Sequence, residues 1–108
     1  MAYFEHEGCS LHYEEYGRGA PLVLVHGLGS SCQDWEMQIP ELAADYHLIL
    51  LDLRGHGRSD KPRERYSIAG FSADLMALLE HLNTGPVHFV GLSMGGMVGF
   101  QFAVDHPE

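Results

Sequence analysis

The fold is decided by the stretch Val87-His88-Phe89-Val90-Gly91-Leu92-Ser93-Met94-Gly95-Gly96. Residues 87–90 form a short, mainly apolar run, which is typical of a strand buried on both faces. Residues from about 94 to 106 have the composition of a helix that stops before Pro107. The serine of residues 91–95 is therefore predicted to lie in a turn between a buried strand and a helix.

A glycine-flanked serine is weak evidence of catalysis by itself. Its place between a strand and a helix strengthens the evidence, because a nucleophilic serine requires such a turn. A nucleophilic serine must project above the sheet, and a strained turn holds it there at a cost of roughly 1–3 kcal/mol. That turn brings together the residues two before and two after the serine, so both must be small, as Gly91 and Gly95 are. The helix N-terminus adds free N–H groups beside Ser93. We predict that Ser93 is a nucleophile; the competing interpretation is a glycine-rich turn with an incidental serine.

Two further apolar runs, residues 22–25 and 47–51, predict two more buried strands. Helical patterns follow them, one apolar stripe at residues 35–42 and another at residues 67–82. Buried strands that alternate with helices form parallel βαβ units. The sequence therefore predicts an α/β protein with a doubly wound, mostly parallel sheet, preceded by a hairpin at residues 3–16.

Ligands of such sheets bind at the carboxyl ends of the strands. The loop after the strand predicted at residues 22–25 begins there with His-Gly-Leu-Gly, residues 26–29. This loop lacks the third glycine of a dinucleotide site and the lysine of a P-loop, which leaves an oxyanion hole as its predicted use. Two backbone N–H groups stabilise the charge that develops in acyl transfer, and we predict that Leu28 and Met94 supply them. Gly27 and Gly29 would free the backbone at Leu28.

The remaining polar residues near these loops have more modest predicted roles. His26 is predicted to position its loop through ring hydrogen bonds, with catalytic base as the alternative. Residues 52–60 are predicted to form a structural loop tied by Arg–Asp pairs, with His56 as a minor candidate for substrate contact. Asp74 and Asp105 fall on predicted helices, where a solvated surface role is expected.

Composition excludes several classes of function. The 108 residues include 15 acidic and 6 basic ones, a formal net charge of −9, so the basic patch that nucleic acids or anionic membranes need is missing. No signal peptide and no run long enough to span a bilayer are visible, so we expect a cytoplasmic protein. Cys9 and Cys32 are expected to remain thiols. The histidines show no ligand spacing such as HExxH, so neither a metal nor a cofactor is expected.

Three motifs, in this order and at this spacing, resemble the α/β-hydrolase superfamily. They are His-Gly-Leu-Gly at 26–29, Asp-Leu-Arg-Gly-His-Gly-Arg-Ser-Asp at 52–60 and Gly-Leu-Ser-Met-Gly-Gly at 91–96. The likeness is greatest to 3-oxoadipate enol-lactonases, small bacterial esterases and cofactor-free haloperoxidases, and it implies the same nucleophile and oxyanion donors. Haloalkane dehalogenases and epoxide hydrolases share the loops but carry aspartate at the position of Ser93, which argues against both.

The resemblance also implies what this chain lacks. In that family the acid and the histidine of the triad follow the helix after the nucleophile, whereas this chain ends at Glu108, at the end of that helix. We therefore expect residues 1–108 to be the N-terminal part of a single α/β-hydrolase domain. The expected activity is that of a serine hydrolase of carboxylic esters, lactones or related small acyl substrates, with the rest of the triad in a missing C-terminal half.

Two alternatives stay open. The chain could be a truncated, non-catalytic module completed by a partner, or a family member with another reaction, such as carbon–carbon bond hydrolysis or perhydrolysis. The resemblance implies that residues 87–90 pair with residues 22–25 on one side and with a strand after Glu108 on the other, so that in this chain they would present an unpaired sheet edge. Such an edge is expected to attract a second copy or the missing half.

Overall fold

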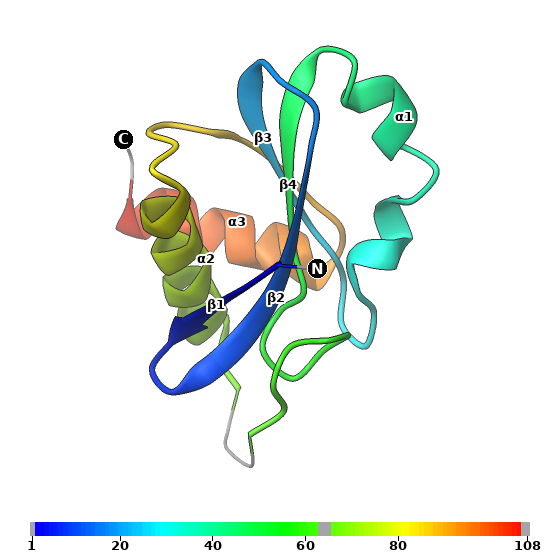
Figure 1. Ribbon diagram of the computed structural model, residues 1–108. Helices are drawn as coiled ribbons and strands as arrows, with labels where there is room; N and C mark the ends of the chain where they lie inside the picture. Colours follow the sequence, from blue (N-terminus) through cyan, green and yellow to red (C-terminus); the bar gives the residue numbers. More distant parts are fainter. Residues whose placement is uncertain (1, 63–65, 107–108) are drawn as a thin grey trace.

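The computed structural model describes residues 2–62 and 66–106 and shows one five-stranded sheet with helices on both faces (Figure 1). The strands are β1 (Ala2–His6), β2 (Cys9–Tyr16), β3 (Ala20–Val25), β4 (Tyr46–Leu51) and β5 (His88–Gly91). The helices are η1 (Cys32–Trp35, a 3₁₀ turn), α1 (Ile39–Leu42), α2 (Ile68–Leu82) and α3 (Met94–Asp105). The sheet order is β1-β2-β4-β3-β5.

The central strands β3 and β4 contribute side chains to a buried cluster on each side of the sheet, because alternate residues of a strand face opposite sides. One side packs with α2 and α3, and the other packs with η1 and α1. The side chains that face α2 and α3 are those of Val23, Val25, Ile49 and Leu51. Those that face η1 and α1 are Leu22, Leu24, Leu48 and Leu50. All of these side chains are buried, which confirms the two predicted strands with both faces covered.

The sheet contains both parallel and antiparallel strand pairs. β3 pairs in parallel with both β4 and β5, as the βαβ pattern predicts. The predicted hairpin is also confirmed, since β1 and β2 pair antiparallel and β2 then adds antiparallel to β4. Its turn lies at Glu7 and Gly8, whose φ angles of 51° and 80° suit a tight hairpin.

Helix α2 begins and ends with capping groups. The Ser67 hydroxyl accepts a hydrogen bond from the Gly70 N–H at 2.9 Å, which satisfies one of the free donors of the first turn. The helix ends at Asn83 in the left-handed conformation. Among residues 2–62 and 66–106, no helix combines the length and the apolarity needed to cross a membrane.

The segment at residues 35–42, whose apolar stripe predicts helical structure, is divided into two short helices. It contains the end of η1 and the short helix α1, with Pro40 in the first turn of α1. Proline has no N–H and its ring clashes with the preceding turn, so a helix tolerates it only at its start. The proline therefore divides this segment into two short helices.

Strand β5 lies at the edge of the sheet described here, with β3 on one side only. The prediction that residues 87–90 are buried on both faces is wrong for this chain, because alternate residues of β5 are exposed and Val90 is 43% exposed. The predicted pairing with residues 22–25 is confirmed. Helix α3, which packs beside β5, also exposes the apolar side chains of Met97, Phe100 and Val104.

Candidate active site

The backbone at Ser93 has an unusual conformation. Its φ and ψ angles are 56° and −112°, in the turn between β5 and α3. Residues other than glycine rarely adopt a positive φ, and holding one there costs roughly 1–3 kcal/mol. The result is an exposed serine at the N-terminus of a helix of 12 residues.

The glycines around Ser93 are required by close backbone contacts. A Cβ atom on Gly91 would overlap the carbonyl group of Gly95, and a Cβ atom on Gly95 would overlap the carbonyl oxygen of Val25. Helix α3 therefore approaches the ends of β5 and β3 more closely than any side chain would permit. The sequence argument that both flanking positions must be small has this physical basis.

The loop after β3 lies directly beside the serine. A Cβ atom placed on Gly27 would be 3.6 Å from the Cβ of Ser93 and 3.3 Å from the carbonyl oxygen of Leu92. Ser30 N–H donates to the Gly27 carbonyl at 3.2 Å, which closes a turn around Leu28. Within the described ranges, no backbone carbonyl accepts a hydrogen bond from the N–H of Leu28 or of Met94.

His26 is fully buried and connects two of the loops at this edge of the sheet. Its Nε2 accepts from the N–H of Leu53 at 2.9 Å, so its Nδ1 carries the proton and donates to the Gly27 carbonyl at 2.6 Å. Burial lowers the pKa of this ring, which keeps it neutral. Because both nitrogens are engaged with the backbone, this geometry favours the positioning role over that of a base.

Asp52 is a residue of this site that the sequence argument missed. Its carboxylate is buried and accepts from two backbone N–H groups, those of Cys32 at 2.7 Å and Arg58 at 3.0 Å. It therefore joins the loop after β4 to the end of the loop after β3. A Cβ atom on Gly57 would overlap this carboxylate, so the loop can approach Asp52 closely only because residue 57 is glycine.

An Arg–Asp pair ties the loop of residues 52–60, as predicted, but it does not join two residues of the loop itself. Arg54 instead pairs with Asp74 of helix α2, through Nε to Oδ2 at 3.1 Å and Nη2 to Oδ1 at 2.9 Å. His6 Nδ1 lies 2.7 Å from the same carboxylate. The prediction that Asp74 is solvated is therefore wrong, since it is fully buried.

A signal for the buried Asp74 was present in the helix pattern. It lies three residues after Phe71 and one before Leu75, within the apolar stripe of α2. Asp105 is exposed as expected and accepts from the side chain of Gln101. His56 is buried, with Nδ1 3.0 Å from the Arg54 carbonyl oxygen.

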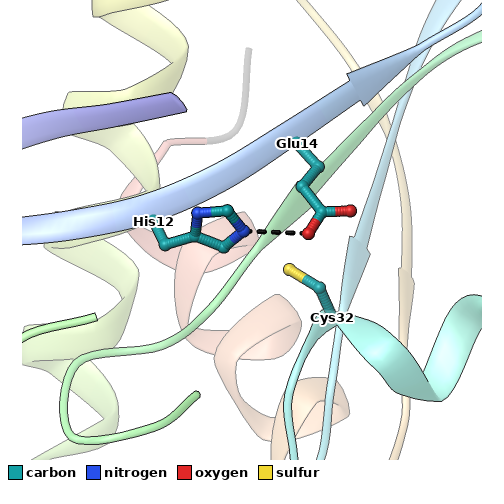
Figure 2. A group of neighbouring side chains, drawn as sticks. All are labelled: His12, Glu14 and Cys32. Carbon is teal, nitrogen blue, oxygen red and sulfur yellow. Dashed lines mark hydrogen bonds and ion pairs between the residues drawn. The ribbon is translucent and has the colours of Figure 1, made fainter. Parts of the chain in front are cut away.

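Among residues 2–62 and 66–106, the structure also assembles two groups of potential metal ligands that no sequence spacing indicated. One is His6, Glu7 and Asp74, which already lie against the Arg54 cation. The other is His12, Glu14 and Cys32 on the opposite face of the sheet (Figure 2). Cys9 and Cys32 do not form a disulfide, as predicted.

No hydrogen bond within the described residues joins Ser93 to a histidine. An isolated serine hydroxyl is a weak nucleophile and needs a base beside it. The groups present at this edge of the sheet are thus a serine in a strained turn and a glycine-rich loop held next to it by His26 and Asp52.

Comparisons with known proteins agree with this arrangement. The family model of the alpha/beta hydrolase fold matches residues 20–108. The chain is 39% identical over 101 residues to a soluble epoxide hydrolase of Corynebacterium sp. (strain C12), with 94% of the chain and 35% of that protein covered. It is 36% identical over 104 residues to 3-oxoadipate enol-lactonase 2 of Acinetobacter baylyi, with 94% of the chain and 39% of that protein covered.

A solved structure gives the same result. Est816, described as an N-acyl homoserine lactone degrading enzyme, superposes with a TM-score of 0.95 at 40% identity, covering 98% of this chain and 41% of that one. The chain thus spans about two-fifths or less of the length of these proteins. On the match of the family model, of sequence and of superposed structure, the chain belongs to the α/β-hydrolase family.

Proposed function

We propose that these residues form the nucleophile and the oxyanion hole of a serine hydrolase that acts on a carboxylic ester, a lactone or a related small acyl substrate. The observation that carries the proposal is the exposed, positive-φ serine between two glycines that permit no side chain. Strain of this kind persists only where the surrounding structure enforces it, and it is concentrated at functional sites.

The proposed reaction is acyl transfer in two steps. Ser93 Oγ attacks the acyl carbon while its proton passes to a histidine, and the leaving oxygen then takes that proton as the acyl–oxygen bond breaks. Water repeats the sequence on the acyl-enzyme and releases the acid. The histidine and its acid partner are proposed to follow residue 108 in the complete protein, and the mechanism uses no cofactor.

The oxyanion formed in each step needs two hydrogen-bond donors. The N–H of Met94 directly follows the nucleophile at the start of α3, and the N–H of Leu28 lies in the loop beside Ser93. Removing one such donor costs roughly 2.7–4 kcal/mol of transition-state stabilisation. We propose that His26 and Asp52 act on this loop as positioning residues.

The residue at position 93 supports acyl chemistry over epoxide opening. The loops are similar to those of an epoxide hydrolase, yet the family pattern for that activity has an aspartate where this chain has serine. An enol-lactonase and a lactone-degrading enzyme are among the similar proteins. Carbon–carbon bond hydrolysis and perhydrolysis would use the same residues and remain the alternative reactions.

A fluorophosphonate probe tests the assignment, because it forms a covalent bond only with an activated serine. The complete protein should be labelled, and Ser93→Ala should lose both labelling and several orders of magnitude in kcat. Ser10→Ala, on the distant strand β2, is the matched control and should label normally. Equal labelling of the Ser93→Ala variant would rule out this nucleophile.

The exposed edge of β5 supports a second proposal, on the partner. The apolar surface of α3 and a cavity of about 560 Å³, lined among others by Leu79, Phe89 and Phe102, lie beside this edge. We propose that a further strand and its helices, from the remainder of the protein or from a second copy, cover this region.

A further inference from the structure

The group of His12, Glu14 and Cys32 lies outside the proposed active site and has no role in it. Residues 12 and 14 are two apart on β2, so their side chains leave the strand on the same face. Cys32 begins η1, and it packs in the cluster of buried residues on that face. Figure 2 shows the His12 ring, the Glu14 carboxylate and the Cys32 sulfur turned toward one another.

The distances within this group suit a metal ion. His12 Nε2 lies 2.8 Å from Glu14 Oε2, and the nitrogen, oxygen and sulfur atoms all lie within 4.8 Å of one another. Zinc bonds of about 2.0–2.3 Å in a tetrahedron place ligand atoms about 3.3–3.8 Å apart, so small side-chain movements would suffice. His12 and Cys32 are buried, whereas the Glu14 side chain is 25% exposed and leaves a route from solvent.

We propose that His12, Glu14 and Cys32 form a binding site for a zinc ion, with water in the fourth position. A nitrogen, an oxygen and a sulfur ligand together suit a borderline-soft cation, which favours zinc over magnesium or calcium. Binding replaces the thiol proton, which leaves for solvent, so one Zn–S bond forms as one S–H bond breaks. No electron transfer is involved.

The charges around the thiol favour a cation. Two carboxylates lie beside Cys32, since its N–H donates to Asp52 Oδ1 at 2.7 Å and its sulfur lies within 4.8 Å of the Glu14 carboxylate. A divalent ion in this place would be attracted by the same two carboxylates.

Neighbouring groups also leave the ligand atoms accessible to the ion. The Tyr16 hydroxyl donates to Glu14 Oε1 at 2.5 Å, which orients the carboxylate and leaves Oε2 facing His12. The other ring nitrogen, His12 Nδ1, is buried without a hydrogen-bond partner among the described residues. It can carry the ring proton when Nε2 binds the ion.

The place of this site in the fold indicates a structural role for the ion. Cys32 follows the loop of residues 26–31, and its N–H donates to Asp52. A zinc ion at this point would join that loop to β2, so it should stabilise the fold without entering the reaction.

Cobalt provides the direct test, since Co²⁺ occupies zinc sites and its bond to a thiolate gives a charge-transfer absorption in the near ultraviolet. The complete protein, purified without a histidine tag, should show this band with one equivalent of Co²⁺, lose it on addition of Zn²⁺ and melt at a higher temperature with Zn²⁺ than after chelation. The band should vanish in Cys32→Ser. The matched control is Cys9→Ser, which removes the other buried thiol and should keep the band.

A second variant covers the case in which Cys32→Ser fails to fold by circular dichroism. Glu14→Gln keeps the size of the side chain and should weaken Co²⁺ binding at least about 10-fold. A wild-type protein without the thiolate band would overturn the proposal. So would a band that survives in Cys32→Ser, because the metal would then be bound by other residues of this histidine-rich chain.

Discussion

At the scale of single residues, the proposed oxyanion hole depends on the backbone more than on side chains. Leu28 illustrates this, since its side chain is 76% exposed while its backbone belongs to the loop that lies against Ser93. The side chain at this position can therefore vary, whereas the amide cannot be lost.

Two substitutions of Leu28 should separate these contributions. Leu28→Ala should lower kcat/KM only modestly, because the amide is kept. Leu28→Pro removes the N–H and should cost roughly 2.7–4 kcal/mol in transition-state stabilisation, measured as the ratio of kcat/KM values. A Leu28→Pro variant that is well folded by circular dichroism and fully active would show that another group is the donor.

Side chains whose partners are backbone groups are the hardest to find in a sequence. The ring of His26 could be predicted to position its loop because it adjoins the glycines. Asp52 could not, because two amides from residues 32 and 58 become its partners only after the chain has folded. Backbone amides exist at almost every position, so they leave no pattern in the sequence.

At the scale of elements, helix α2 is fixed to the loop after β4 by a buried ion pair. The side chains of Arg54 and Asp74 are 9% and 1% exposed, and two hydrogen bonds join them. Removing one partner of such a pair leaves a buried charge without compensation, which typically costs 3–5 kcal/mol.

Asp74→Ala should therefore lower the free energy of unfolding of the complete protein by about 3–5 kcal/mol, measured by urea denaturation. Asp105→Ala is the matched control, since Asp105 is also a helical aspartate but is exposed, and it should change stability by less than about 0.5 kcal/mol. If the two variants were equally stable, the ion pair would not be holding α2 in place.

At the scale of the whole molecule, the edge of β5 decides how this chain behaves alone. Its outer side offers unpaired backbone groups, and α3 exposes Phe100 and Val104 beside it. Such an edge promotes pairing with another chain. Exposed apolar patches of this kind mark surfaces that associate.

We predict that the purified 108-residue chain self-associates and does not hydrolyse p-nitrophenyl acetate through Ser93. Light scattering measures the first property and ester turnover the second. A stable monomer whose turnover is lost in Ser93→Ala would contradict both parts of the prediction and would make His56 the next base to test.

Sequence alone predicted the parts of this fold that are local. Runs of apolar residues indicated β3 and β4, and two glycines around a serine indicated the turn at Ser93, because each feature is contained in a few neighbouring residues. It failed where distant segments meet. Arg54 with Asp74, and His12 and Glu14 with Cys32, are brought together only by the packing of the sheet and its helices.

The close contact between Gly95 and the carbonyl of Val25 has a consequence for engineering this site toward new substrates. Helix α3, which begins after the proposed nucleophile Ser93, meets the start of the loop of residues 26–31 at this contact. A larger residue at position 95 would therefore displace both together, and a change at either alone could not restore their arrangement. Libraries should instead vary Leu28 and Leu92, whose side chains are exposed at the two loops and whose backbones can stay in place.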